Sequence, residues 1–62
     1  MKVRDIIKII ERNGWYQVRQ RGSHRHYKHP SKPGLVTIPG KRSQDLYPEM
    51  VASILRQAGL KR

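Results

Sequence analysis

The apolar residues of this chain form two stripes with helical spacing, one near each end. The first stops at Asn13-Gly14, so residues 3–13 are predicted to form a helix; its apolar residues are Val3, Ile6, Ile7 and Ile10. The second surrounds Pro48, which suits the first turn of a helix, and is capped by Gly59; its apolar residues are Leu46, Met50, Val51, Ile54, Leu55 and Ala58. Because the chain has 62 residues and no Cys, packing alone must hold one thin core.

Between the stripes the apolar residues alternate with polar ones, which is typical of strands. From residue 15 to 21, Tyr16 and Val18 lie on one side and Gln17, Arg19 and Arg21 on the other, as in a half-buried strand. A two-residue type II′ turn at Gly22-Ser23 would lead into a second strand over residues 24–29. In that strand we expect one side to face the helices, with Arg25, Tyr27 and His29, and the other to stay open, with His24, His26 and Lys28.

A third strand is predicted over residues 35–39, after a turn rich in Pro and Gly, with Val36 and Ile38 facing inward. A basic loop over residues 40–45 then leads to the second helix. The expected fold class is α+β, with the order α-β-β-β-α. Two helices would cover one face of a three-stranded antiparallel sheet, and residues 1–62 would form a single domain.

The charge of the chain is extreme and unevenly distributed. Lys and Arg number 14 against 4 acids, so the formal net charge is +10. No acid occurs between Glu11 and Asp45, whereas that stretch contains all three histidines and Arg12, Arg19, Arg21, Arg25, Lys28, Lys32, Lys41 and Arg42. The strong positive electrostatic field of such a chain favours a polyanionic partner, and nucleic acid is the expected ligand. A membrane partner is not expected, because no apolar run approaches the roughly 20 residues of a membrane span and neither helix suits a membrane surface.

The predicted turn places histidines and cations together on the open side of the sheet. Across it Arg21 would pair with His24, Arg19 with His26, and Gln17 with Lys28. An imidazole at His24, with cations beside it to hold a phosphate, is suited to take the proton of a ribose 2′-OH. The alternative is that His24 is only one polar side chain on an exposed strand.

Other residues of the chain could bind a metal ion, an RNA base or a protein partner. A metal site at His24 and His26 is not expected, because the chain has no Cys and no carboxylate nearby, and no cofactor is implied. Trp15 and Tyr16 could stack bases but fit the core or a sheet edge more simply. Ile9 falls off the first stripe, as a lone surface residue or as part of a partner surface.

Several short motifs along almost the whole chain resemble the HicA family of toxin ribonucleases. They are Asn-Gly-Trp at 13–15, Val-Arg-Gln at 18–20, Arg-Gly-Ser-His at 21–24 followed by Tyr27, and Ile-Leu-Arg-Gln-Ala-Gly-Leu at 54–60. The chain departs from many relatives after the third strand, where it reads Pro39-Gly40-Lys41 in place of a further histidine. A second catalytic histidine is therefore not assigned, and Lys41 or His26 is the candidate helper.

The resemblance implies a fold similar to the double-stranded-RNA-binding domain and cleavage of mRNA as the toxin of a type II toxin–antitoxin pair. His24 maps to the family's catalytic histidine, and a HicB-like antitoxin would be the protein partner. The residues expected to bind RNA are Arg19, Arg21, Gly22, Ser23, His26, Lys28, Lys41 and Arg42. The absence of Cys fits a cytoplasmic location. Two other functions remain open: a non-catalytic RNA-binding domain of the same fold, and a DNA-binding protein that uses its basic hairpin.

Overall fold

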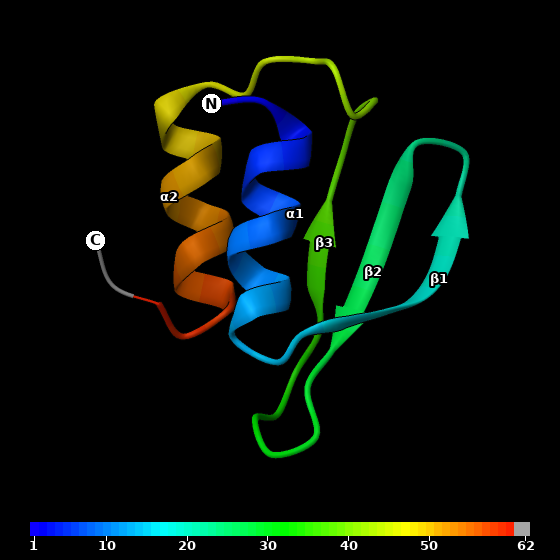
Figure 1. The fold of residues 1–62 in the computed structure, drawn as a ribbon, viewed down its shortest axis with the longest axis vertical. Coiled ribbons are helices and arrows are strands. Elements are labelled where there is room, and N and C mark those ends of the chain that lie inside the picture. The colour runs from blue at the N-terminus through cyan, green and yellow to red at the C-terminus, as the bar shows by residue number, and fades with distance from the viewer. Residues whose placement is uncertain (61–62) are drawn as a thin grey trace.

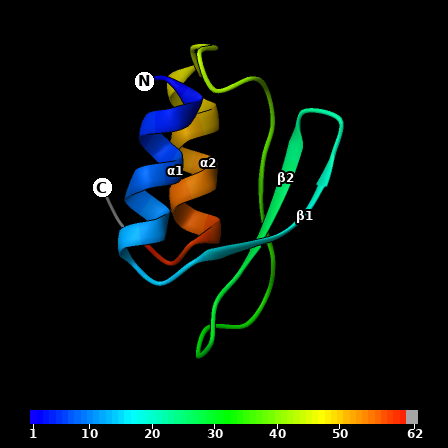
Figure 2. The ribbon, with the colours of Figure 1, turned by 45° about the vertical axis from the view of Figure 1, so that its right-hand side comes forward.

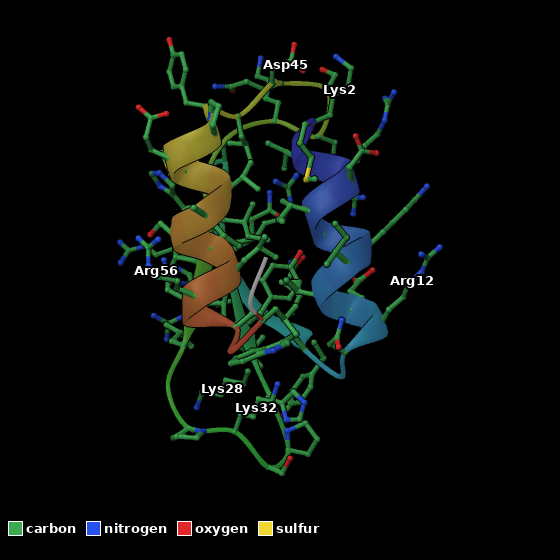
Figure 3. All side chains as sticks on the ribbon, turned by 90° about the vertical axis from the view of Figure 1, so that its left-hand side faces the viewer. Lys2, Arg12, Lys28, Lys32, Asp45 and Arg56 are labelled. Carbon is green, nitrogen blue, oxygen red and sulfur yellow. The ribbon has the colours of Figure 1, made fainter. Side chains whose placement is uncertain are left out.

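Two helices lie side by side against one face of a three-stranded sheet (Figures 1 and 3). The computed structural model describes residues 1–60. The elements are α1 (Val3–Arg12), β1 (Tyr16–Arg21), β2 (His24–Lys28), β3 (Val36–Ile38) and α2 (Pro48–Gln57). The strands are antiparallel and lie in the order β1-β2-β3. The predicted α+β class and the order α-β-β-β-α are confirmed, and the stated bounds of the first helix and the strands differ from the observed ones by at most one residue.

Both helices end in the same glycine-containing cap, which turns the chain toward the core. In α1, Gly14 has a φ of 96°, a backbone conformation that residues other than glycine rarely adopt. Its N–H donates to the Glu11 carbonyl at 3.1 Å, and the N–H of Trp15 donates to the Ile10 carbonyl at 3.1 Å. Gly59, with φ 74°, occupies the corresponding position after α2. The predicted stops at both glycines are therefore confirmed.

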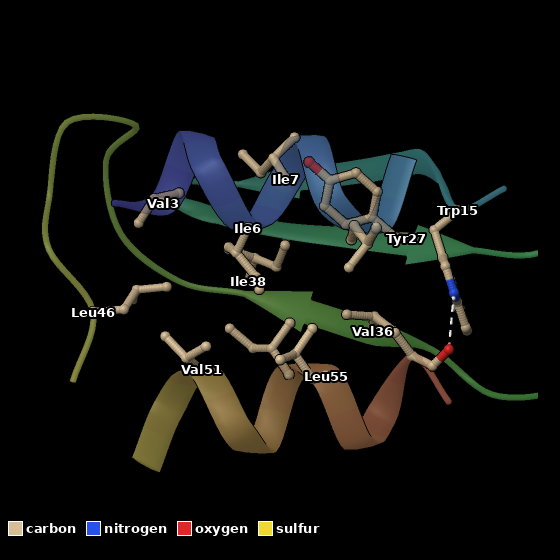
Figure 4. Packing of buried hydrophobic residues seen from close by; sticks show 13 residues of the cluster. Val3, Ile6, Ile7, Trp15, Tyr27, Val36, Ile38, Leu46, Val51 and Leu55 are labelled. Atoms are coloured by element: carbon tan, nitrogen blue, oxygen red, sulfur yellow. Dashed lines mark hydrogen bonds between the residues drawn. The ribbon is translucent and has the colours of Figure 1, made fainter. Parts of the chain in front are cut away.

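The core lies between the helices and the two strands β2 and β3 (Figure 4). It consists of Val3, Ile6, Ile7, Ile10, Trp15, Tyr27, Val36, Ile38, Leu46, Val51, Ile54, Leu55 and Ala58. Both predicted helical stripes are represented, and the inward placement of Tyr27, Val36 and Ile38 is confirmed. Ile9 packs partly buried against this cluster, so it is not a lone surface residue. Met50, which belongs to the predicted second stripe, remains 39% exposed.

The expectation that β1 is half-buried is wrong, because every residue of the strand is exposed. β1 is one of the two edge strands, and its hairpin with β2 leans away from the helices (Figure 2). A β-bulge between Gln17 and Arg19 also shifts the register, so that Tyr16 lies opposite Lys28 and Gln17 opposite Tyr27. The predicted pairing of Gln17 with Lys28 is therefore wrong as well.

Backbone hydrogen bonds connect the N-terminal residues to the loop before α2, and they hold this loop beside the start of α1. The Leu46 N–H donates to the Met1 carbonyl at 2.8 Å, and the Val3 N–H donates to the Gln44 carbonyl at 2.9 Å. The ammonium of Lys2 lies 3.6 Å from the Asp45 carboxylate, where the two labelled side chains meet in Figure 3. Residues 40–45 are thus held in place although they form no helix or strand.

Candidate functional site

The face of the sheet turned away from the helices, here called the open face, carries the predicted cluster of histidines and cations. Burial alternates along β2: Arg25 and Tyr27 are buried, whereas His24 and Lys28 are exposed and His26 is half-buried. The register confirms two of the predicted pairs, Arg21 with His24 and Arg19 with His26. The open face therefore contains Arg19, Arg21, His24, His26 and Lys28, without the predicted Gln17.

His24 occupies the most accessible position of this cluster. It is the first residue of β2, is exposed, and follows the turn directly. Gly22 has φ 59° while Ser23 has no positive φ, the combination expected of the predicted type II′ turn. Directly opposed residues have Cβ atoms about 4.5–5.5 Å apart, which brings the Arg21 side chain within reach of a group bound at His24. Within residues 1–60 the His24 ring makes no hydrogen bond, so both of its nitrogens are available to a ligand.

His26, in contrast, is held from the third strand. Its Nδ1 lies 3.1 Å from the hydroxyl oxygen of Thr37, the residue opposite it in β3. This bond fixes the plane of the imidazole and leaves Nε2 as the ring nitrogen without a protein partner in the described part of the chain. The ring of His26 is therefore held in one orientation by a hydrogen bond, whereas no hydrogen bond within residues 1–60 holds the ring of His24.

The loop after β3 brings further cations to the end of the sheet that holds the turn (Figure 1). The Arg25 guanidinium donates to the Gly40 carbonyl at 2.8 Å, which ties the buried face of β2 to the start of this loop. The Arg4 N–H donates to the Arg42 carbonyl at 3.0 Å. Lys41 and Arg42 are exposed there, and neither side chain forms a hydrogen bond to His24 among the residues described.

A hollow of about 340 Å³ lies on the open face beside the histidines, and two of its residues were not predicted. It is lined by Val18, Arg19, His26, Lys28 and Leu35. Val18 was expected to face inward but is 46% exposed, and Leu35, expected only as the start of a strand, is 45% exposed. The bulge explains Val18, because two residues of the bulged strand, Val18 and Arg19, oppose His26 and both lie on its side of the sheet.

His29 has a structural role at the opposite end of the hairpin. Its Nε2–H donates to the Asn13 carbonyl at 2.7 Å, and its Nδ1 accepts the N–H groups of Ser31 and Lys32 at 3.0 and 3.2 Å. The ring also meets Trp15 edge-on, with centroids 5.2 Å apart. His29 points toward the helical side, as predicted, and its hydrogen bonds are already taken up.

The Tyr27 side chain lies on the helix side of the sheet, away from the open face. The Tyr27 hydroxyl is buried on the helix side, and burial, followed by the charge of Glu11, raises its pKa, so that it stays protonated at neutral pH. No group of three His, Asp or Glu side chains in residues 1–60 lies close enough to hold a metal ion.

Comparison with known families bears directly on this arrangement. A protein-family profile described as "HicA toxin of bacterial toxin-antitoxin" matches residues 3–60. The chain belongs to the HicA toxin family. In this HicA protein the segment Gly22-Ser23-His24 forms the turn and the start of β2, and so presents His24 at the rim of the open face.

Two further findings concern this HicA protein. No curated protein matches the chain. Over the residues that the structure describes, neither helix has the length and apolar character needed to cross a membrane.

Proposed function

We propose that this HicA protein is an endoribonuclease that cleaves mRNA without a metal ion, with His24 as the catalytic residue. One observation supports it above the others: His24 is an exposed imidazole with no hydrogen bond of its own in residues 1–60, and it lies opposite Arg21 on a face crowded with cations. The toxin would act in the cytoplasm as a single domain over residues 1–62, neutralised by a HicB-like antitoxin. Its α-β-β-β-α order is compatible with a fold similar to the double-stranded-RNA-binding domain.

The chemistry needs only groups that the open face, the loop after β3 and the RNA supply. His24 removes the proton from a ribose 2′-OH, and the 2′-oxygen attacks the adjacent phosphorus. The bond from phosphorus to the 5′-oxygen breaks, which leaves a 2′,3′-cyclic phosphate on one fragment and a 5′-hydroxyl on the other. Arg21 and Arg19 would stabilise the negative charge that grows on the phosphate. His26 and Lys41 are the candidates for protonating the departing 5′-oxygen.

A non-catalytic RNA-binding domain is the second candidate, because the formal charge of +10 and the basic open face would bind RNA without any reaction. Phosphate contacts by Arg19, Arg21, Lys28, Lys41 and Arg42 serve both functions equally. Gly22 and Ser23 would let the RNA backbone approach the turn closely. The two candidates differ only in whether RNA fragments are produced and in whether activity depends on His24. A DNA-binding protein would instead protect duplex DNA and leave RNA intact.

Cleavage by this HicA protein should continue in EDTA and should leave 2′,3′-cyclic phosphate ends. The reason is that the nucleophile comes from the RNA and the proposed base is an imidazole, so no step requires a metal-bound water. The measurement is incubation of purified protein with a structured transcript, with and without chelator, followed by mapping of both new ends. Loss of cleavage in EDTA with rescue by a divalent ion, or 3′-hydroxyl products, would refute this mechanism.

The antitoxin is expected to cover the open face around Arg19, Arg21 and His24 with an acidic or apolar surface. Complementary charge accelerates association more than it strengthens a complex. Changing both Arg19 and Arg21 to Glu should therefore slow complex formation at low salt, as measured by stopped-flow or surface plasmon resonance. A matched variant with Arg12 and Arg56 changed to Glu alters the net charge equally, on the helices instead of the sheet. Equal slowing by both variants would indicate a partner that senses only total charge, and no slowing by the first would place the partner elsewhere.

A further inference from the structure

The hollow on the open face lies one strand pair away from His24. Arg19 and His26 form the next pair on the open face after Arg21 and His24, and both line the hollow. Its volume of about 340 Å³ is at the lower end of the roughly 300–1,000 Å³ that is typical of small-molecule sites. The hollow is therefore large enough for one planar group of a ligand, next to the point where His24 would act.

Two walls of the hollow are apolar although the face around them is strongly charged. Val18 is placed there by the bulge and Leu35 by the segment that precedes β3, and both are about half-exposed. Aliphatic side chains on a sheet usually pack into the core, but Val18 and Leu35 lie on the side of the sheet that faces away from the core. They offer a surface that the flat side of a base can cover, and covering it would remove apolar area from water.

The other three residues supply directed polar contacts. Arg19 and Lys28 carry only hydrogen-bond donors, which suits phosphate oxygens. His26 is oriented by Thr37 through Nδ1, so its Nε2 has a defined direction and can meet a polar atom at the edge of a base. An apolar pair with fixed polar groups beside it is the usual composition of a ligand site.

We propose that this hollow is a nucleotide subsite that takes one unpaired base of the RNA next to the bond that is cut. The proposal rests on the ribonuclease function proposed above. Val18 and Leu35 contact the face of the base, and Arg19 and Lys28 hold the flanking phosphates. The Nε2 of His26 contacts the edge of the base, which leaves Lys41 as the group that protonates the departing 5′-oxygen. Because a base within a duplex is stacked and paired, its faces are not free to enter, and the substrate at this position is single-stranded.

The first test measures binding alone, so that it does not depend on cleavage. A short, fluorescently labelled single-stranded RNA with 2′-O-methyl groups cannot react, because its 2′-oxygens carry no proton. Changing Val18 and Leu35 together to Ala should weaken its binding at least about tenfold, since each covered methylene-sized group contributes about fourfold. The dependence of affinity on salt should not change, because no phosphate contact is lost, whereas Arg19→Ala should reduce the slope by about 0.7.

Two controls make the binding test specific. Tyr47→Ala removes a larger apolar side chain that is 78% exposed next to α2, and it should leave binding unchanged. A duplex of the same sequence should bind the parent and the double variant equally. Unchanged single-strand affinity in the double variant, or an equal loss on duplex, would overturn the subsite.

The second test uses cleavage and separates this proposal from the first. If the parent cuts RNA, the ends that it produces should show a base preference at one position beside the cut, and the double variant should lose that preference. A preference that survives in the double variant would overturn the subsite while leaving the ribonuclease intact. If the parent does not cut RNA at all, the ribonuclease fails, and the binding test still decides whether the hollow takes a base.

Discussion

Replacing His24 by Ala should abolish growth inhibition and lower the rate of RNA cleavage by about 10²- to 10⁴-fold, the usual contribution of a general acid or base. RNA binding and antitoxin binding should persist, because the cations of the open face remain. The fold should persist as well, since an exposed strand position loses little packing on truncation. The measurements are a growth assay, single-turnover cleavage of a transcript and circular dichroism.

Two other histidines serve as controls for this variant. His29→Ala removes an imidazole whose nitrogens bond only to structural groups, so it should lower stability but retain cleavage per folded molecule when assayed well below its melting temperature. His26→Ala should have an intermediate effect, because His26 is on the same face but one pair further from the turn. Cleavage by His24→Ala at near the parent rate, or a loss explained by unfolding alone, would favour the non-catalytic RNA-binding domain.

Replacing Trp15 by Ala should have the largest effect on stability. The indole is buried, and its N–H donates to the Ala58 carbonyl at 3.2 Å, which joins the start of β1 to the end of α2 (Figure 4). Truncating a buried aromatic residue typically costs about 3–5 kcal/mol. At about 0.05–0.15 kcal/mol per residue, a domain of this size has only about 3–9 kcal/mol to lose. We therefore expect a large unfolded fraction at 37 °C.

The matched variant is Trp15→Phe, which keeps most of the ring and removes the N–H. The Ala58 carbonyl would keep its bond from the Lys32 ammonium at 3.3 Å, so the expected loss is only about 1 kcal/mol. Urea unfolding followed by circular dichroism measures both variants; fluorescence does not, because Trp15 is the only Trp in the chain. Equal losses in the two variants would mean that the hydrogen bond, and not ring packing, provides the stabilisation.

The sequence predicts the order of elements well because each helix and each inner strand must bury an apolar set. It predicts β1 poorly because no residue of that strand is part of the core, so the alternation of its polar and apolar residues does not identify a buried side. A signal for the bulge is nevertheless present. Trp15 and Arg21 are both odd-numbered, so strict alternation places them on the same face, yet a large aromatic residue belongs in the core and Arg21 does not. One extra residue between them resolves the conflict, and Val18 is that residue.

The sequence predicts the part of the site that depends on the turn between β1 and β2. It does not predict the part that depends on segments distant in the sequence. Gly22-Ser23 alone determines that Arg21 opposes His24 and Arg19 opposes His26. The contribution of Leu35 and the bond from Thr37 to His26 require the placement of β3, which no local pattern gives. The place of Lys41 at the same end of the sheet likewise follows from the bond between Arg25 and Gly40.

The separation of β1 from the core has a consequence for how such a toxin can evolve. Residues outside the core can be exchanged at little cost to folding, so Arg19, Val18 and Tyr16 are open to substitution in a way that Ile6 and Tyr27 are not. A saturation library over β1, scored for soluble expression, should tolerate most changes, while growth inhibition should tolerate few. Target preference and antitoxin pairing can then diverge between lineages while the same scaffold is retained.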